Sequence, residues 1–236
     1  MKKTIFYFFA FLLFLRSGLL LAGVTRFSDS LCEDDRFQCR EIQEGDSWTS
    51  IWEDAEYRDQ IKRLNRMNIK LRPGMKIAVP VDPQFFKNNQ NLPFPAKVDA
   101  PLEKQVRVNL SILAWGAYDE EGNLLKWGPA SGGKGWCPDV GTKCVTPAGE
   151  YSVLNKQGAQ CISHKFPIPR GGAPMPYCMF FRRGYALHGS PEVPGYNASH
   201  GCVRLFTEDA KWLNEEFMKG FEGQGNDNHV KVLIER

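Results

Sequence analysis

The chain has 236 residues, of which 42% are hydrophobic and 24% charged, and its formal net charge is +3. So small a charge argues against a dedicated nucleic-acid-binding protein, which carries a concentrated basic face, although it still permits attraction to an anionic polymer. The length allows one well-formed hydrophobic core and a small additional module.

The N-terminus predicts export. Lys2 and Lys3 precede an apolar run over residues 5–15, the arrangement of a secretory signal peptide. We predict that residues 1–23 form this signal, with cleavage after Ala22, and that the protein resides in the periplasm or cell envelope. The alternative is an uncleaved membrane anchor, in which Arg16 would lie near the middle of the span, where a charge is costly. Membrane attachment is expected only in that case.

The cysteines also fit an exported protein. Their number is odd, which suggests one free thiol beside paired cysteines in an oxidising compartment. They are Cys32, Cys39, Cys137, Cys144, Cys161, Cys178 and Cys202. Pairing of near neighbours gives Cys32–Cys39, Cys137–Cys144 and Cys161–Cys178 and leaves Cys202 free. Buried reduced cysteines are the alternative, and the lack of a C-x-x-C pair argues against metal binding.

The first region after the leader predicts a small module over residues 38–82. Asp46 or Ser47 is a suitable N-cap for a helix that begins at Trp48. A second helix is predicted over residues 58–65, and residues 75–80 alternate as a short strand. With a strand at the start of the region, the expected order is strand–helix–helix–strand (βααβ).

This module resembles a LysM domain. The resemblance rests on Gly45-Asp46-Ser47, on Leu64-Asn65 and on residues 71–80, and it departs at Cys39-Arg40, where an aromatic residue is common. It implies binding to glycan strands that contain N-acetylglucosamine, such as those of peptidoglycan. A packing or dimerisation module without glycan affinity is the alternative. Spaced prolines and asparagines then predict a linker over residues 83–104.

The C-terminal region, residues 105–236, predicts a mainly β domain with one substantial helix. Alternation predicts one strand over residues 106–114, and a turn then leads into residues 124–127. A glycine-rich loop is expected over residues 128–135. Further strands are expected over 149–154, 179–182, 185–188 and 229–234. Thr207 is the expected N-cap of the helix, Gly220 ends it, and Ala210, Leu213 and Phe217 form its buried stripe.

A short motif near the C-terminus predicts the chemistry. Cys202 lies in Ser199-His200-Gly201-Cys202-Val203-Arg204-Leu205, and His188 stands 14 positions upstream. A thiol and an imidazole are the groups needed for nucleophilic catalysis through a thiolate. His200 and Arg204 are expected to lower the pKa of the thiol, and the amides of Gly201 and Cys202 are candidate oxyanion donors. A zinc site formed by His188, His200 and Cys202 is the competing interpretation; we expect no metal and no cofactor.

Residues 105–236 resemble the YkuD-type L,D-transpeptidase catalytic domain, which implies a β-rich, sandwich-like fold. The resemblance rests on Leu187-His188-Gly189-Ser190, on the cysteine motif, and on the segments at residues 130–133 and 146–151. It implies that Cys202 attacks the bond between the diamino acid and the terminal D-Ala of a peptidoglycan tetrapeptide stem. His188 acts as base and then as acid, the carbonyl of Gly189 orients it, and a thioester acyl-enzyme passes to an amine. The chain departs from the family pattern in two ways. The spacing from His188 to Cys202 is short, and Arg204 stands where some members have Asn.

The resemblance leaves the substrate contacts and the acceptor open. Ser199, His200, Arg204, Met175 and Tyr177 are the expected substrate-binding residues. Arg204 either holds a substrate carboxylate or pairs with an acidic side chain. Residues 171–177 form either a mobile flap or an ordered loop pinned by Cys178. The acceptor amine gives a 3→3 cross-link, lipoprotein attachment or D-amino acid exchange, whereas water would make the protein an L,D-carboxypeptidase. A non-catalytic wall-binding scaffold is the third hypothesis.

Overall fold

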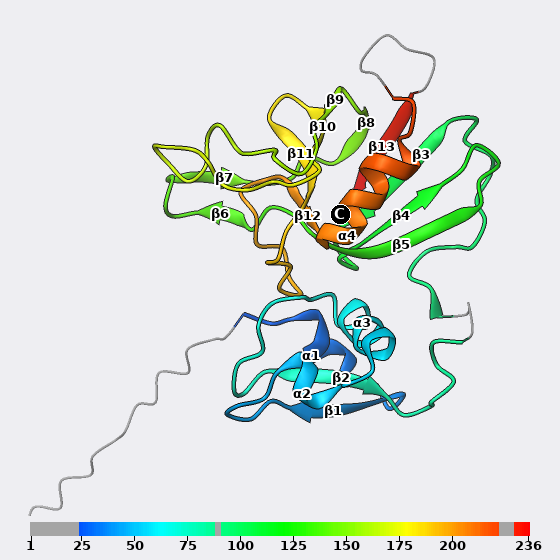
Figure 1. Cartoon of the computed structure of the whole chain (residues 1–236), viewed down its shortest axis with the longest axis vertical. Coiled ribbons are helices and arrows are strands. Elements are labelled where there is room, and N and C mark those ends of the chain that lie inside the picture. Colours follow the sequence, from blue (N-terminus) through cyan, green and yellow to red (C-terminus); the bar gives the residue numbers. More distant parts are fainter. Residues whose placement is uncertain (1–23, 88–90, 222–228) are drawn as a thin grey trace, which may run out of the picture.

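The computed structural model describes residues 24–87, 91–221 and 229–236, so the predicted leader lies outside the described residues. A small N-terminal module packs below a larger β domain (Figure 1). Within the described residues, no helix has both the length and the apolar character needed to cross a membrane.

The N-terminal module begins with a short helix that was not predicted, α1 (Phe27–Leu31), and then has the predicted βααβ order. These four elements are β1 (Phe37–Glu41), α2 (Trp48–Ile51), α3 (Ala55–Leu64) and β2 (Lys76–Pro80). Strands β1 and β2 pair antiparallel, and a disulfide joins Cys32 to Cys39. Ser47 caps α2, as expected for a hydroxyl that accepts from a free amide. Helix α3 begins earlier than predicted because the Asp54 carboxylate accepts from the Tyr57 amide.

The larger domain is built on a nine-stranded sheet in the order β8-β13-β3-β4-β5-β12-β11-β10-β9. Its strands are β3 (Lys104–Asn109), β4 (Ala114–Tyr118), β5 (Leu124–Ser131), β8 (Gly149–Ser152), β9 (Asn155–Lys156), β10 (Met179–Arg182), β11 (Tyr185–Gly189), β12 (Val203–Leu205) and β13 (Val230–Glu235). The two edge strands, β8 and β9, are separated by only two residues of chain. The sheet must therefore curl back on itself, and the amide of Leu154 donates to the carbonyl of Phe180 across the junction.

Two predictions for this sheet, one of a strand and one of a loop, were wrong in detail. The alternating segment 106–114 is split into β3 and β4 by a turn, because the Asn109 side chain accepts from the amides of Ser111 and Ile112. This local turn overrides the alternating pattern. The predicted glycine-rich loop 128–135 begins as part of β5, which continues to Ser131. A separate hairpin, β6 (Gly135–Cys137) and β7 (Thr142–Cys144), follows and carries the Cys137–Cys144 disulfide.

The predicted helix packs against the inner face of the sheet. It consists of α4 (Thr207–Trp212) followed by a π-helical turn, Leu213–Phe217. Phe206, not Thr207, is the N-cap, and no side chain caps this end. The predicted stripe of Ala210, Leu213 and Phe217 is buried in the main core. Nonpolar side chains from seven strands share that core, which fixes the sheet around the helix.

A buried ion pair fastens the module to this helix. The Arg63 guanidinium on α3 donates to both carboxylate oxygens of Asp209 on α4, at 2.8 and 2.9 Å. Asp209 is fully buried, and Lys126 Nζ, 3.3 Å away, is its other cationic partner. Because two guanidinium hydrogen bonds fix distance and direction together, this contact sets how α3 lies on the β domain.

We expect Arg63→Ala to lower the free energy of unfolding by about 3 kcal/mol, because a buried carboxylate loses its bidentate partner and keeps only Lys126. Urea unfolding followed by tryptophan fluorescence measures the loss. Arg58→Ala on the same helix is the matched control, since Arg58 donates only to the carbonyls of Trp52 and Glu53. A similar loss in both variants would show that the buried ion pair is not responsible.

Candidate active site

The two strands that carry the predicted catalytic residues lie side by side. Strands β11 and β12 pair in parallel, with Leu187 opposite Val203 and His188 opposite Arg204. Leu187 and Val203 point into the core. Because side chains alternate along a strand, His188 and Arg204 lie on the other face, and Cys202, two positions before Arg204, belongs to that face as well.

His188 is held as a neutral base. Its side chain is buried, with 6% of its surface exposed, and Nδ1 lies 2.9 Å from the carbonyl oxygen of Gly189. A carbonyl can only accept, so Nδ1 carries the hydrogen and Nε2 keeps its lone pair. Burial lowers the pKa of His188 to about 4, the Gly189 carbonyl opposes this shift, and the charge of Arg204 adds to it. The imidazole is therefore unprotonated at neutral pH.

Cys202 is the free thiol, and the other six cysteines form the three predicted disulfides. Its Sγ donates to the carbonyl of Gly184 at 3.6 Å. Burial raises the pKa of Cys202, while the Ala186 amide and the charge of Arg204 act in the opposite direction. Arg204 thus acts in the predicted direction, but the predicted net fall of the pKa was wrong, because desolvation is the larger effect. The resting pair is therefore a neutral thiol and a neutral imidazole.

Ser199 organises the turn before Cys202. Its hydroxyl donates to the carbonyl of Cys202 and accepts from the amide of Gly201 at 2.9 Å. This bond occupies the Gly201 amide, so the prediction that this amide faces an oxyanion is not supported by the observed conformation. The Gly201 carbonyl accepts from the buried Thr146 hydroxyl at 2.8 Å. Sequence reasoning gave Thr146 no role, although it lies in a segment that carried the family resemblance.

Only glycine fits at position 201. Its φ is +128°, a conformation that side-chain-bearing residues rarely adopt, and a Cβ there would lie 2.7 Å from Cε1 of Tyr185. The close approach of Tyr185 to this backbone thus requires the glycine of the motif. It also limits the backbone conformation directly before Cys202.

His200 lies away from the catalytic pair. Its Nε2 is 2.6 Å from a carboxylate oxygen of Asp139 in the β6–β7 hairpin, and its ring packs on Phe166 at 4.5 Å between centroids. The hydrogen bond from His200 lowers the pKa of Asp139. Among the described residues, His200 belongs to one group of potential metal ligands, together with Cys137 and Cys144. The sulfurs of these two cysteines are bonded to each other in a disulfide. The alternative zinc set of His188, His200 and Cys202 is not assembled there.

The other predicted substrate contacts occupy different environments. Arg204 donates to the Glu192 carbonyl at 3.2 Å and lies 3.7 Å from the Glu192 carboxylate, so its guanidinium has an acidic neighbour and is also partly exposed. Met175 is buried beside the Cys161–Cys178 disulfide in the small cluster that Cys202 contacts. Tyr177 packs on the main core. Within residues 171–177, the amides of Met175 and Tyr177 donate to the carbonyls of Cys161 and Gly158.

The family comparison agrees with this geometry. The YkuD family, the L,D-transpeptidase catalytic domain, matches residues 104–232, more than half of the chain. The chain belongs to this family. Its catalytic domain begins at β3 and includes both strands of the His188–Cys202 site.

Individual relatives match less of the chain. Over 61 residues, a quarter of this chain, the sequence is 41% identical to the probable L,D-transpeptidase YbiS of Escherichia coli K12. That match spans only a fifth of the curated relative. The crystal structure of the L,D-transpeptidase from Xylanimonas cellulosilytica is 25% identical, with a TM-score of 0.50 over 70% of this YkuD chain and 72% of that chain. The mainly β, curled-sheet architecture is thus shared with a solved L,D-transpeptidase.

Proposed function

We propose that this YkuD protein is a peptidoglycan L,D-transpeptidase with Cys202 as nucleophile and His188 as general base. The observation that carries the proposal is the free thiol of Cys202 on the same sheet face as a neutral His188, whose Nδ1 is fixed by Gly189. Membership of the family supports the reaction class. The substrate is a tetrapeptide stem, cleaved between its diamino acid and the terminal D-Ala.

The first half-reaction forms a thioester. Nε2 of His188 accepts the thiol proton as the Cys202 sulfur bonds to the carbonyl carbon, so no thiolate has to persist in the buried resting site. His188 then gives that proton to the leaving nitrogen as the C–N bond breaks, and D-Ala departs as a neutral amine. Because His188 starts neutral, one imidazole performs both proton transfers.

The second half-reaction transfers the acyl group. An amine attacks the thioester carbonyl as His188 takes a proton from its nitrogen. The C–S bond then breaks, and His188 returns the proton to the sulfur, which regenerates the Cys202 thiol. A diamino acid of a second stem as acceptor gives a 3→3 cross-link, whereas a lipoprotein lysine or a free D-amino acid gives attachment or exchange. Water in the same position gives the L,D-carboxypeptidase reaction.

The N-terminal module and the compartment complete the proposal. The βααβ order and the Gly45-Asp46-Ser47, Leu64-Asn65 and 71–80 segments support a LysM-like module that binds glycan strands. Three disulfides beside one free thiol support an exported protein in an oxidising compartment such as the periplasm. Peptidoglycan would then supply both partners, with glycan at the module and stem peptides at Cys202.

Mass spectrometry of the purified protein with a disaccharide-tetrapeptide tests this function. We expect loss of D-Ala together with a dimer that is one D-Ala lighter than two substrate molecules. The control is the same protein pretreated with iodoacetamide, which blocks the free thiol and leaves disulfides intact. Tripeptide without dimer would assign hydrolysis, and substrate unchanged beside active reference enzyme would contradict both reactions and favour the scaffold hypothesis.

A further inference from the structure

The loop that joins the two catalytic strands rests on the N-terminal module. This loop, residues 190–198, runs from the end of β11 to Ser199, and its middle lies against the turn after α3. Met67 and Pro194 form an antiparallel bridge, and the amide of Asn68 donates to the carbonyl of Val193 at 2.9 Å. Met67 and Val193 are both completely buried.

The Asn68 side chain makes two further hydrogen bonds to the loop backbone. Its Nδ2 donates to the carbonyl of Ser190, and its Oδ1 accepts from the amide of Val193, both at 2.9 Å. One side-chain amide thereby holds two points of the loop that are three residues apart. Together with the backbone hydrogen bond, Asn68 makes three hydrogen bonds to a loop that has no helix or strand of its own. These bonds pair backbone groups that regular secondary structure would otherwise pair.

A second contact from the module reaches the loop at Gly195, whereas residues 196–198 are bonded to Leu110, Ser131 and Gly132 of the β domain. The Phe27 amide, from the start of α1, donates to the carbonyl of Gly195 at 2.8 Å. Gly195 has φ +82°, and a Cβ there would lie 3.2 Å from Cε of Met67. The loop and the module are thus fitted closely enough that a side chain at position 195 would be both strained and crowded.

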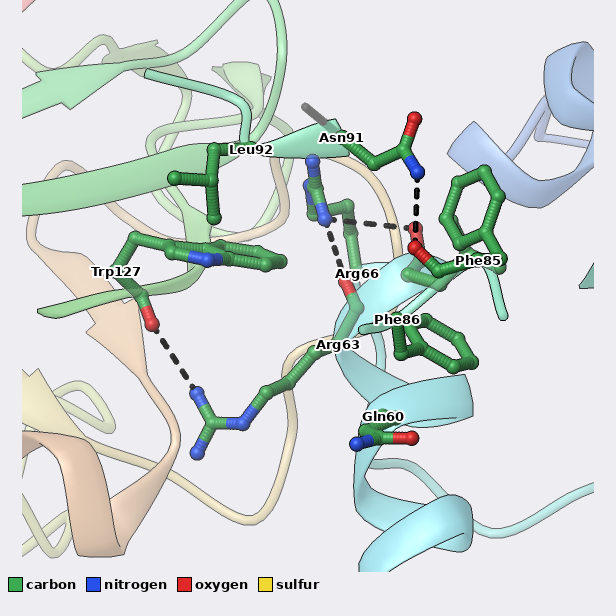
Figure 2. A pocket seen from close by; sticks show the side chains of 9 residues that line it. Gln60, Arg63, Arg66, Phe85, Phe86, Asn91, Leu92 and Trp127 are labelled. Carbon is green, nitrogen blue, oxygen red and sulfur yellow. Dashed lines mark hydrogen bonds between the residues drawn. The ribbon is translucent and has the colours of Figure 1, made fainter. Parts of the chain in front are cut away.

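A cavity lies elsewhere at the junction. Figure 2 shows it between α3, Phe85 and Phe86, and Trp127, with Arg63 and Arg66 on its wall. Its volume is about 240 Å³, and no residue of the loop 190–198 lines it. The contacts between Asn68 and the loop are therefore separate from this cavity.

The loop connects directly to the chemistry. The loop begins directly after His188-Gly189. It ends directly before Ser199, which organises the turn before Cys202. Within it, the Glu192 carbonyl and carboxylate lie beside the Arg204 guanidinium. Displacement of this loop would alter the relation between His188, Arg204 and Cys202, and errors of about 1 Å in such a relation cost about 100-fold in rate.

We propose that Asn68 is a positioning residue for the active site, and that the N-terminal module completes the catalytic unit by holding the loop between His188 and Cys202. This role is separate from any affinity of the module for glycan. The holding of the loop by Asn68 is independent of the proposed function. The effect of Asn68 on catalysis rests on the proposed function.

Asn68→Ala in the full-length protein tests both parts. We expect backbone amides of residues 190–198 to exchange about tenfold faster by hydrogen–deuterium exchange mass spectrometry, because the loop opens locally. We also expect kcat for D-Ala release to fall by about 10- to 100-fold with KM little changed. Asn68→Asp keeps the acceptor for Val193 and the side-chain volume but turns an oxygen toward the Ser190 carbonyl, so a change of the same kind is expected in this variant if the alanine variant folds poorly.

Arg58→Ala is the matched control. Arg58 lies on α3 of the same module, and its side chain donates to the carbonyls of Trp52 and Glu53, away from the loop. Faster loop exchange and lower kcat in Asn68→Ala, with both near wild type in Arg58→Ala, would support the proposal. Unchanged loop exchange in Asn68→Ala, faster exchange with unchanged kcat, or equal effects in both variants would overturn it.

A wild-type protein that releases no D-Ala would contradict the proposed function and still leave a decisive measurement. Cys202 can then be followed by its rate of alkylation with iodoacetamide. A rate in Asn68→Ala that departs from wild type by more than about threefold, with Arg58→Ala unchanged, would support the holding of the active-site loop, because thiol reactivity follows its surroundings. Equal rates in all three proteins would overturn it.

Discussion

Cys202→Ala is expected to abolish both D-Ala release and cross-linking, with kcat/KM reduced by at least about 10³-fold. The reaction requires a nucleophile that forms the thioester, and Cys202 is the free cysteine, since the other six are in disulfides. Mass spectrometry of the stem peptides measures the loss. Intact-protein mass measurement should also show an acyl adduct, lighter than the tetrapeptide by D-Ala, on wild type and not on the variant.

A conservative replacement separates loss of chemistry from loss of structure. Cys202 packs against the cluster of Cys161, Met175 and Ala186, so a smaller side chain leaves a gap there. Cys202→Ser nearly preserves the volume and removes the sulfur. We expect it to unfold close to the wild-type temperature and to be inactive as a transpeptidase. If Cys202→Ser kept more than about a tenth of the wild-type rate, sulfur would not be the attacking atom.

Local patterns in the sequence were enough to predict the free cysteine and much of the fold. Cys202 was singled out by its motif, and the pairing of near neighbours predicted all three disulfides. The buried stripe of the long helix followed from helical spacing. These features depend on residues close in sequence, where chain connectivity limits the possible arrangements.

The errors arose where distant residues or competing local bonds decide the outcome. The thiol pKa was predicted to fall because cations are near in sequence, whereas the folded chain buries Cys202 and raises it. The Asn109 side chain ended a strand that alternation alone would continue. The contacts of His200 with Asp139 and of Asn68 with Val193 join residues 61 and 125 positions apart. Single-sequence patterns carry no signal for such pairs.

His188→Gln is expected to lower kcat/KM by about 10²- to 10⁴-fold, the contribution of a positioned general base. Glutamine preserves most of the side-chain volume and can still donate toward the Gly189 carbonyl, but it has no group that accepts a proton and returns it. Asp139→Asn is a matched control at the other motif histidine. It weakens the contact with His200 and leaves the catalytic pair untouched, so its rate should stay within about threefold of wild type.

The pH dependence gives His188 a signature of its own. Burial lowers its pKa from 6.5 to about 4, and the imidazole must be neutral to accept the thiol proton. The kcat/KM of wild type should therefore stay constant as the pH falls through 6.5 and should decline only as the pH approaches about 4.

The same pKa shift affects folding stability, because between pH 6.5 and about 4 the unfolded chain binds a proton at His188 that the folded protein does not. Folding stability should fall as the pH drops from 6.5 toward 4, and this slope should be shallower in His188→Gln. A wild-type rate that declines near 6.5 would mean that the working base is a solvated histidine. The buried position of His188, and the neutral thiol–imidazole mechanism built on it, would then be wrong.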